Sequence, residues 1–400
     1  MRHPITFKLF FCVLLVTVLF NLGALAQVEA NSQPVAYAYV GSSVAAQQDY
    51  SQGIITGFAV AADGSAQAIR GRVTGGISGL TSAAGFVFGV GQLGTTVTTY
   101  TPQSDGSLRA TSAVNVIQNY LQGQDEYIGN LNPDRTGKFL NVGAVWPNSD
   151  FVPFAIAANG SLSYLGTTIG GCGKSQALLT FSPDNRWAYD QCWGDYSKYG
   201  RQANGVLDGP FDFQLNQPPS MLGSGACQPV LMSSSSLGYL AVVWNGSAYS
   251  CDSNQGNLLA SYKVDPDGNP ILVPGSTVAV QVSELDVAFD PSGSYLALAG
   301  YVGNKSEGAI QVFRLQSDGK PVALGNPILL SGVTNVTSVR WDNVGHLYAI
   351  AVGQGQQSCA GSDSKCGLYI FNVTTEGLTT APGSPHMVTY PSNVAVLAEK

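Results

Sequence analysis

The chain has 400 residues, of which 11% are charged; it contains 48 glycines and carries a formal net charge of −7. In a typical soluble domain about 25% of residues are charged and about 7% are glycine. So few charges exclude a protein built of exposed amphipathic helices, and the negative balance excludes the basic surface that binds nucleic acid non-specifically.

The N-terminal segment has the layout of a secretory signal peptide. A positively charged start precedes the apolar run LFFCVLLVTVLF, and ALA at 24–26 offers small residues for cleavage before Gln27. A membrane anchor is the alternative, but the run is shorter than the roughly 20 residues of a spanning helix. We therefore expect a signal peptide at 1–26, one mature domain at 27–400, no membrane span, and a secreted or periplasmic location.

A unit of four predicted strands recurs along the mature chain. Its seven copies begin, in chain order, at VAYAYVGSS, AGFVFGVG, YIGNLNPDRTG, ALLTFSPDN, PVLMSSSSLG, LDVAFDPSG and VTSVRWDNVG. The sixth copy shows the unit in full, as LDVAFDPSG, SYLALAGYV, AIQVFRLQSDG and KPVALGNPILL. Four strands in about fifty residues are typical of a β-propeller.

The first copy lacks an innermost strand, and the C-terminal segment Ser392–Lys400, SNVAVLAEK, supplies one. We predict an all-β, seven-bladed β-propeller with four antiparallel strands per blade, in which the C-terminal strand closes the first blade and removes its open edge. Turns such as Asp105-Gly106 and Asp318-Gly319 join the third and fourth strands, where glycine tolerates positive φ. We expect these turns opposite the ligand entrance, where they serve shape rather than chemistry.

Six cysteines remain once the signal peptide and its Cys12 are removed. An even number in an exported chain predicts disulfides, and a zinc site is the alternative. No CxxC pair occurs, and only two of the three histidines lie in the mature chain, so disulfides are favoured. Two cysteines precede an innermost strand and two follow the next strand, which favours the pairs Cys172–Cys192 and Cys227–Cys251, beside a local pair Cys359–Cys366.

No cofactor or metal is expected. The GxGxxG match at 89–94 is followed by the strand-like TTVTTY, whereas a dinucleotide site needs a helix there.

Candidate site residues gather in loops at the predicted entrance, where polar and aromatic groups converge as a small-molecule pocket requires. The predicted ligand-binding residues are Asp49, Tyr50, Arg72, Asp125, Tyr127, Glu284 and Tyr390. The predicted catalytic residues are His386, Glu126 and Lys174. The other histidine, His346, falls in a turn expected on the opposite face.

The repeats LNPDRTGKFLNVG, FDPSGSYLALAG and VFRLQSDGKPV resemble those of the seven-bladed propeller lactonases, which include 6-phosphogluconolactonase-type enzymes and fungal carboxymuconate cyclases. The resemblance covers nearly all of the mature chain. The family's functional motifs are replaced: LQGQDEYIGNL stands where His-x-His is typical, AVWPNSDFV where DLGxDRV is typical, and ACQPVLM where GPRH is typical.

Two functions follow as expectations. The first is an exported lactonase-like propeller that has lost the catalytic motifs and serves, as a monomer, to bind a small molecule, a carbohydrate-derived ligand or a protein partner. The alternative is a diverged lactone hydrolase for a sugar or aromatic lactone, with His386 or Glu126 as base near Lys174 or Arg72.

Overall fold

The computed structural model describes residues 33–43, 53–75, 79–91, 94–121, 127–145, 149–170, 177–191, 196–213, 215–219, 227–246, 256–303, 307–353, 359 and 365–399. Contacts divide the chain into two units, Met1–Pro34 and Val35–Lys400. The predicted signal peptide at 1–26 lies outside the described residues, so its cleavage stays a prediction. Within the described part, no helix is long and apolar enough to cross a membrane.

The described strands form seven antiparallel sheets, which we number as blades. Blade 1 holds β1 (Ala36–Ser43), β2 (Gly53–Val60), β3 (Ala66–Thr74) and β31 (Pro391–Ala398). Blade 2 holds β4 (Leu80–Ala83), β5 (Phe86–Val90), β6 (Thr96–Pro102) and β7 (Leu108–Asn115), and is followed by the helix α2 (Val116–Tyr120). Blade 3 holds β8 (Tyr127–Pro133), β9 (Phe139–Val145), β10 (Ser149–Ile156) and β11 (Leu162–Tyr164). Blade 4 holds β12 (Leu179–Phe181), β13 (Trp187–Gln191), β14 (Tyr196–Arg201) and β15 (Leu207–Asp212).

Blades 5 to 7 each carry an additional short strand that pairs with the third strand. Blade 5 holds β16 (Gln228–Ser234), β17 (Tyr239–Asn245), β18 (Asn257–Val264), β19 (Pro270–Leu272) and β20 (Val278–Val280). Blade 6 holds β21 (Ser283–Phe289), β22 (Tyr295–Val302), β23 (Glu307–Leu315), β24 (Pro321–Ala323) and β25 (Ile328–Leu330). Blade 7 holds β26 (Asn335–Trp341), β27 (His346–Val352), β28 (Gly367–Thr374), β29 (Gly377–Thr380) and β30 (His386–Met387).

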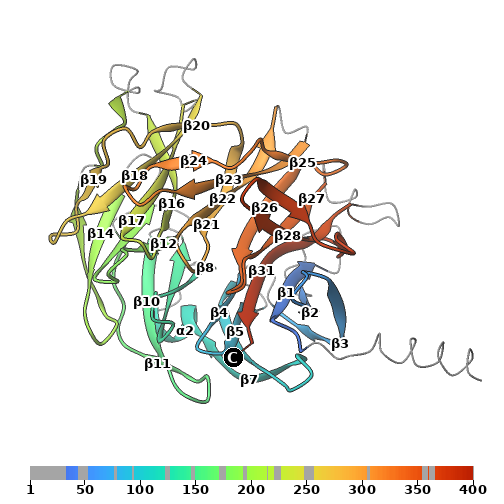
Figure 1. Cartoon of the computed structure of the whole chain (residues 1–400). Helices are drawn as coiled ribbons and strands as arrows, with labels where there is room; N and C mark the ends of the chain where they lie inside the picture. The colour runs from blue at the N-terminus through green and yellow to red at the C-terminus, as the bar shows by residue number, and fades with distance from the viewer. Residues whose placement is uncertain are drawn as a thin grey trace, which may run out of the picture. The chain divides into compact units, whose positions relative to one another are not determined.

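The C-terminal strand closes blade 1, as the sequence predicts. β31 runs antiparallel to β1, from Ala36 opposite Ala398 to Ser42 opposite Pro391, and the two strands lie side by side in Figure 1. Because β31 is the end strand of this sheet, the first blade takes its innermost strand from the far end of the chain. The seven-bladed, all-β propeller is thereby confirmed.

The innermost strands form the inner ring of the propeller. β31 contacts β4 and β26, and contacts continue from β4 to β8, from β12 to β16 to β21, and from β21 to β26. Blades 3 and 4 are joined by Asn132, whose side chain donates to the carbonyl of Ala177 at 3.0 Å and accepts from the N–H of Leu179 at 3.1 Å. In antiparallel blades, the turns after the first and third strands meet at one rim, the turn rim. The other loops and the connections between blades form the opposite loop rim.

The core fills the spaces between neighbouring blades. One buried cluster joins Phe58 of blade 1 to Ile350 and Leu368 of blade 7, and another joins blades 5 and 6. A middle strand such as β17 is therefore buried on both faces from Leu240 to Trp244. This explains why the strands read as continuous apolar runs rather than alternating ones.

The recurring turn between third and fourth strands packs on the neighbouring blade. The Gly106 turn of blade 2 lies on the ring of Tyr37 in blade 1, so closely that a Cβ there would overlap the ring, and Gly106 has φ +78°. The same contact recurs between Gly160 and Phe86, Gly205 and Phe139, Gly268 and Trp187, and Gly319 and Tyr239. Glycine is required at these positions by both φ and close approach. The repeated hairpin therefore fixes each of blades 2 to 6 on the preceding blade.

Between blades 7 and 1 a histidine takes the place of that aromatic ring. His346 is buried; its Nδ1 lies 2.7 Å from Asp342 Oδ2, and its Nε2 lies 3.3 Å from the carbonyl oxygen of Ala62 in blade 1. Both neighbours are acceptors, which suits an imidazolium that donates from both nitrogens. Burial opposes the charge, but the hydrogen bond to Asp342, the negative charge of Asp342 and the hydrogen bond to Ala62 together outweigh burial and raise the pKa of His346.

Candidate functional site

The structure places the predicted site residues in different parts of the propeller. Five of them lie outside the described residues, so their placement stays open: Asp49, Tyr50, Asp125, Glu126 and Lys174. Of the others, Tyr127 begins β8, Glu284 is the second residue of β21, and Tyr390 directly precedes β31. These three residues lie at the starts of innermost strands, on the loop rim, and their binding role stays a prediction.

Arg72 lies apart from that rim. It belongs to β3, the outermost strand of blade 1, and not to a connection between blades as its sequence position suggested. With Tyr39 and Gly106 it lines a pocket of about 240 Å³ between blades 1 and 2. Arg72 therefore cannot act together with Glu284 on one small ligand.

His386 also lies away from the inner ring. It forms part of β30, where it pairs with Leu368 at the start of the third strand of blade 7. Its ring packs on Phe58 of blade 1, with the ring centroids 5.4 Å apart, and its Nε2 is buried without a hydrogen-bond partner among the described residues. Burial lowers the pKa of His386. These features describe a neutral histidine packed between two blades.

Glu284 is the acid–base candidate at the loop rim. Its Oε2 accepts a hydrogen bond of 2.6 Å from Asn257 Nδ2, and Asn257 in turn accepts one of 3.3 Å from the N–H of Gly246. Burial raises the pKa of Glu284 to about 7. A carboxyl group that titrates near neutral pH is suited to proton transfer.

The inner ring also contains a pocket that the sequence did not reveal. It measures about 260 Å³ and lies towards the turn rim, opposite the predicted entrance. Residues in or directly beside the innermost strands of blades 4 to 7 line it, together with Pro133 at the end of β8 and Arg135 just after that strand. The other lining residues are Leu178, Leu179, Thr180, Phe181, Leu231, Met232, Ser233, Ser234, Asp286, Val287, Ala288, Phe289 and Arg340.

Arg135 reaches this pocket from the first turn of blade 3. Its Nη1 donates to the carbonyl oxygen of Ser234 at 2.9 Å and to Ser234 Oγ at 2.6 Å. Because Ser234 ends β16 in blade 5, the side chain passes over blade 4. Partial burial lowers the pKa of Arg135, although a guanidinium remains charged at any physiological pH.

The turn that carries Arg135 is held by the buried side chain of Asp134. Asp134 Oδ1 accepts from the backbone N–H groups of Lys138 and Phe139, each at 3.1 Å. Its Oδ2 pairs at 2.7 Å with the guanidinium of Arg201 in blade 4, which is 9% exposed. Arg135 therefore projects from a turn fixed to two blades.

The second cation of the pocket is already paired. Arg340 Nη1 lies 2.7 Å from Asp286 Oδ2, which also accepts from the backbone N–H of Val339 at 2.9 Å. Asp286 Oδ1 accepts from the N–H of Val287 at 2.9 Å. Two guanidinium groups and one carboxylate thus leave a net charge of about +1 in the pocket.

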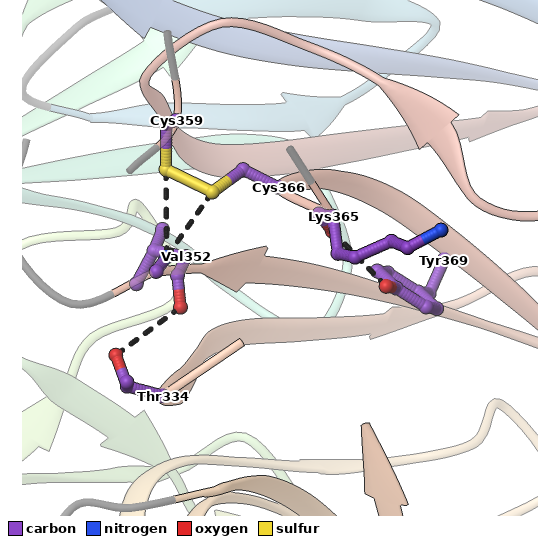
Figure 2. Close-up of a disulfide and its surroundings, with 7 residues drawn as sticks. Thr334, Val352, Cys359, Lys365, Cys366 and Tyr369 are labelled. Atoms are coloured by element: carbon purple, nitrogen blue, oxygen red, sulfur yellow. Dashed lines mark hydrogen bonds between the residues drawn. A yellow bond between two sulfur atoms is a disulfide. The ribbon is translucent and has the colours of Figure 1, made fainter. Parts of the chain in front are cut away.

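The local disulfide Cys359–Cys366 is confirmed, with Cα atoms 5.4 Å apart. The backbone N–H of Gly353 donates to both sulfur atoms, and the neighbouring Val352 accepts a hydrogen bond from Thr334, which precedes β26 (Figure 2). Cys227 is disulfide-bonded. Its predicted partner and the other predicted pair lie outside the described residues, so these pairings stay predictions: Cys251, Cys172 and Cys192.

Within the described ranges, no group of three or more His, Cys, Asp or Glu side chains is placed to hold a metal ion.

No protein-family model matches the sequence, and no curated protein matches it. Solved structures share the fold. A candidate 6-phosphogluconolactonase from Bacteroides fragilis aligns with a TM-score of 0.65 at 15% identity, covering 92% of this chain and 99% of that one. The periplasmic gluconolactonase of Pseudomonas aeruginosa aligns with a TM-score of 0.64 at 16% identity, covering 91% of this chain and 99% of that one. A Lactobacillus plantarum protein aligns with a TM-score of 0.60 at 13% identity, covering 90% and 99%. The structural neighbours are thus seven-bladed propellers of the 6-phosphogluconolactonase type, and identities this low establish the shared fold alone.

Proposed function

We propose that this chain is an exported, lactonase-like propeller that has lost lactonase catalysis and binds a small molecule in the turn-rim pocket. The observation that carries the proposal is the pocket of about 260 Å³ at the turn rim of the inner ring, which combines apolar and polar lining residues with Arg135 and the Arg340–Asp286 pair. Ligand sites typically have this composition, and the volume suits a small metabolite. The replaced family motifs at the loop rim support the loss of catalysis.

Export rests on the N-terminal segment alone. N-terminal sequencing of the protein recovered outside the cytoplasm is expected to begin at Gln27. Recovery of an intact Met1 terminus from the cytoplasm would remove this part of the proposal and leave the binding role untouched.

Binding and turnover are separated by one panel of sugar and aromatic lactones with their hydrolysed acids. We expect saturable binding by calorimetry without hydrolysis above the spontaneous rate. Ser233→Trp, which fills the pocket, is expected to abolish binding, whereas Ser317→Trp at an exposed turn leaves it intact. Binding that survives Ser233→Trp would exclude this pocket as the site.

The second candidate function is a diverged lactone hydrolase, and Glu284 favours it because its pKa of about 7 suits a general base. The packing of His386 between blades 7 and 1 makes that residue a weaker base candidate than Glu284. Turnover of any lactone with a pH–rate profile that breaks near 7, lost in Glu284→Gln, would replace the binding role with this one.

A further inference from the structure

Arg135 is a cation without an acidic partner. No carboxylate among the described residues forms an ion pair with it, and its Nη1 donates only to Ser234. A guanidinium carries five N–H donors in a planar fork that matches a carboxylate. Arg135 lines the pocket, so donors that Ser234 leaves free are available to a ligand there.

The neighbouring charges do not satisfy Arg135. Asp286 already accepts from Arg340, Val339 and Val287 with its two oxygens. The pocket therefore contains one complete ion pair, Arg340 with Asp286, and a second cation, Arg135, that has no anion. A ligand with a single negative charge completes the second pair.

The walls of the pocket define the rest of the ligand. Nine apolar residues line it beside six polar or charged ones; the apolar ones are Pro133, Leu178, Leu179, Phe181, Leu231, Met232, Val287, Ala288 and Phe289. Surroundings of this kind favour an apolar ligand body through the area removed from water. They disfavour a phosphate, whose second negative charge would be desolvated without a matching cation.

We propose that the turn-rim pocket binds a small monocarboxylic acid with an apolar body, whose carboxylate pairs with Arg135. This inference rests on the proposed function, because it names the ligand class of that pocket. The Asp134-anchored turn and the hydrogen bonds to Ser234 hold the guanidinium in place before the ligand arrives, which limits the entropy lost on binding.

Benzoate and its neutral isostere benzamide test the ligand class in the purified mature chain. By calorimetry at low salt, benzoate is expected to bind about tenfold or more tightly than benzamide, since a charge-assisted pair replaces a neutral hydrogen bond. Arg135→Gln is expected to remove this preference, and Arg135→Lys to retain part of it. Arg314→Gln, at an exposed position of β23, is the matched control and is expected to bind as the unaltered chain does. Unchanged urea unfolding of each variant shows that the fold is intact.

The outcomes distinguish a failure of the inference alone from a failure of the proposed function. Equal binding of benzoate and benzamide, both lost in Ser233→Trp, overturns the acid preference and keeps the pocket as the binding site. A preference for benzoate that persists in Arg135→Gln assigns the anion to another group and overturns the inference. Tighter binding of inorganic phosphate than of benzoate overturns the ligand class. Absence of binding by benzoate, benzamide and the lactone panel overturns both proposals.

Discussion

Replacing Glu284 by glutamine is expected to stabilise the protein above neutral pH. The folded state raises the pKa of this carboxyl from 4.5 to about 7, because burial disfavours the charged form. Since the folded state then binds more protons than the unfolded chain between these values, wild-type stability falls as pH rises from 4.5 to 7. Above pH 7 the carboxyl is charged in the folded state, and the full cost of burying this charge lowers the free energy of unfolding.

The size of the effect follows from the difference between the folded and unfolded pKa of Glu284. One pH unit corresponds to 1.36 kcal/mol, so the limit is about 3 kcal/mol, and the partial exposure of Glu284 reduces it to about 2 kcal/mol. Glutamine preserves the shape and keeps an oxygen to accept from Asn257. We therefore expect Glu284→Gln to exceed the wild type by about 2 kcal/mol at pH 8 and to equal it near pH 4.5.

Urea unfolding of both proteins at the two pH values measures this difference. The exposed Glu376 provides the matched control, and Glu376→Gln is expected to leave the free energy of unfolding within about 0.5 kcal/mol at both. Titration of His346 occurs in all three proteins and cancels in the comparison. A Glu284→Gln variant no more stable than the wild type at pH 8 would refute the burial argument, and with it the case for Glu284 as a base at neutral pH.

Three further substitutions test the contacts between blades. Asp134→Ala leaves the buried guanidinium of Arg201 unpaired and is expected to cost about 3–5 kcal/mol in urea unfolding; a loss below 1 kcal/mol would show that the pair is effectively solvated. His346→Gln is expected to lower the free energy of unfolding most below pH 6.5, because the protonated ring makes both hydrogen bonds. The loss is expected to shrink as pH rises through the raised pKa of the folded state. A loss independent of pH would mean that the ring stays neutral. Gly106→Ala forces a Cβ into the ring of Tyr37 at a φ of +78° and is expected to lower the free energy of unfolding by about 3 kcal/mol, whereas unchanged stability would show that the turn can move away.

The fold was predictable because the same four-strand pattern recurs along the sequence. Five blades place an aromatic residue near the start of their second strand, as in Phe139 and Trp187, and a glycine turn in the next blade packs on it. The strand that the first copy lacks was also predictable from the sequence. The apolar residues Val394 and Ala395 lie in a strand-like segment that follows the seventh complete unit and belongs to no unit of its own. Local repetition thus specified the number of blades and the way the ring closes.

The candidate site was less predictable because it depends on distances across the ring. Arg135 lies in NPDRTG, which reads as an ordinary turn, and only the curvature of the propeller brings it over blade 4 to Ser234. Arg340 lies in β26, and only the closed ring of blades brings this residue to the pocket. His386 was misleading for a related reason, because its connection forms β30 and pairs back on its own blade.

The location of the pocket also changes what the turn rim contributes. The turns between third and fourth strands serve shape, since their glycines leave room only for the neighbouring ring. The first turn of blade 3 does more, because the buried Asp134 fixes its backbone while the adjacent Arg135 projects inward. Positioning a charged group on a rigid, doubly anchored turn is what a preorganised binding site requires. The same rim that holds the blades together therefore supplies the cation of the proposed ligand site.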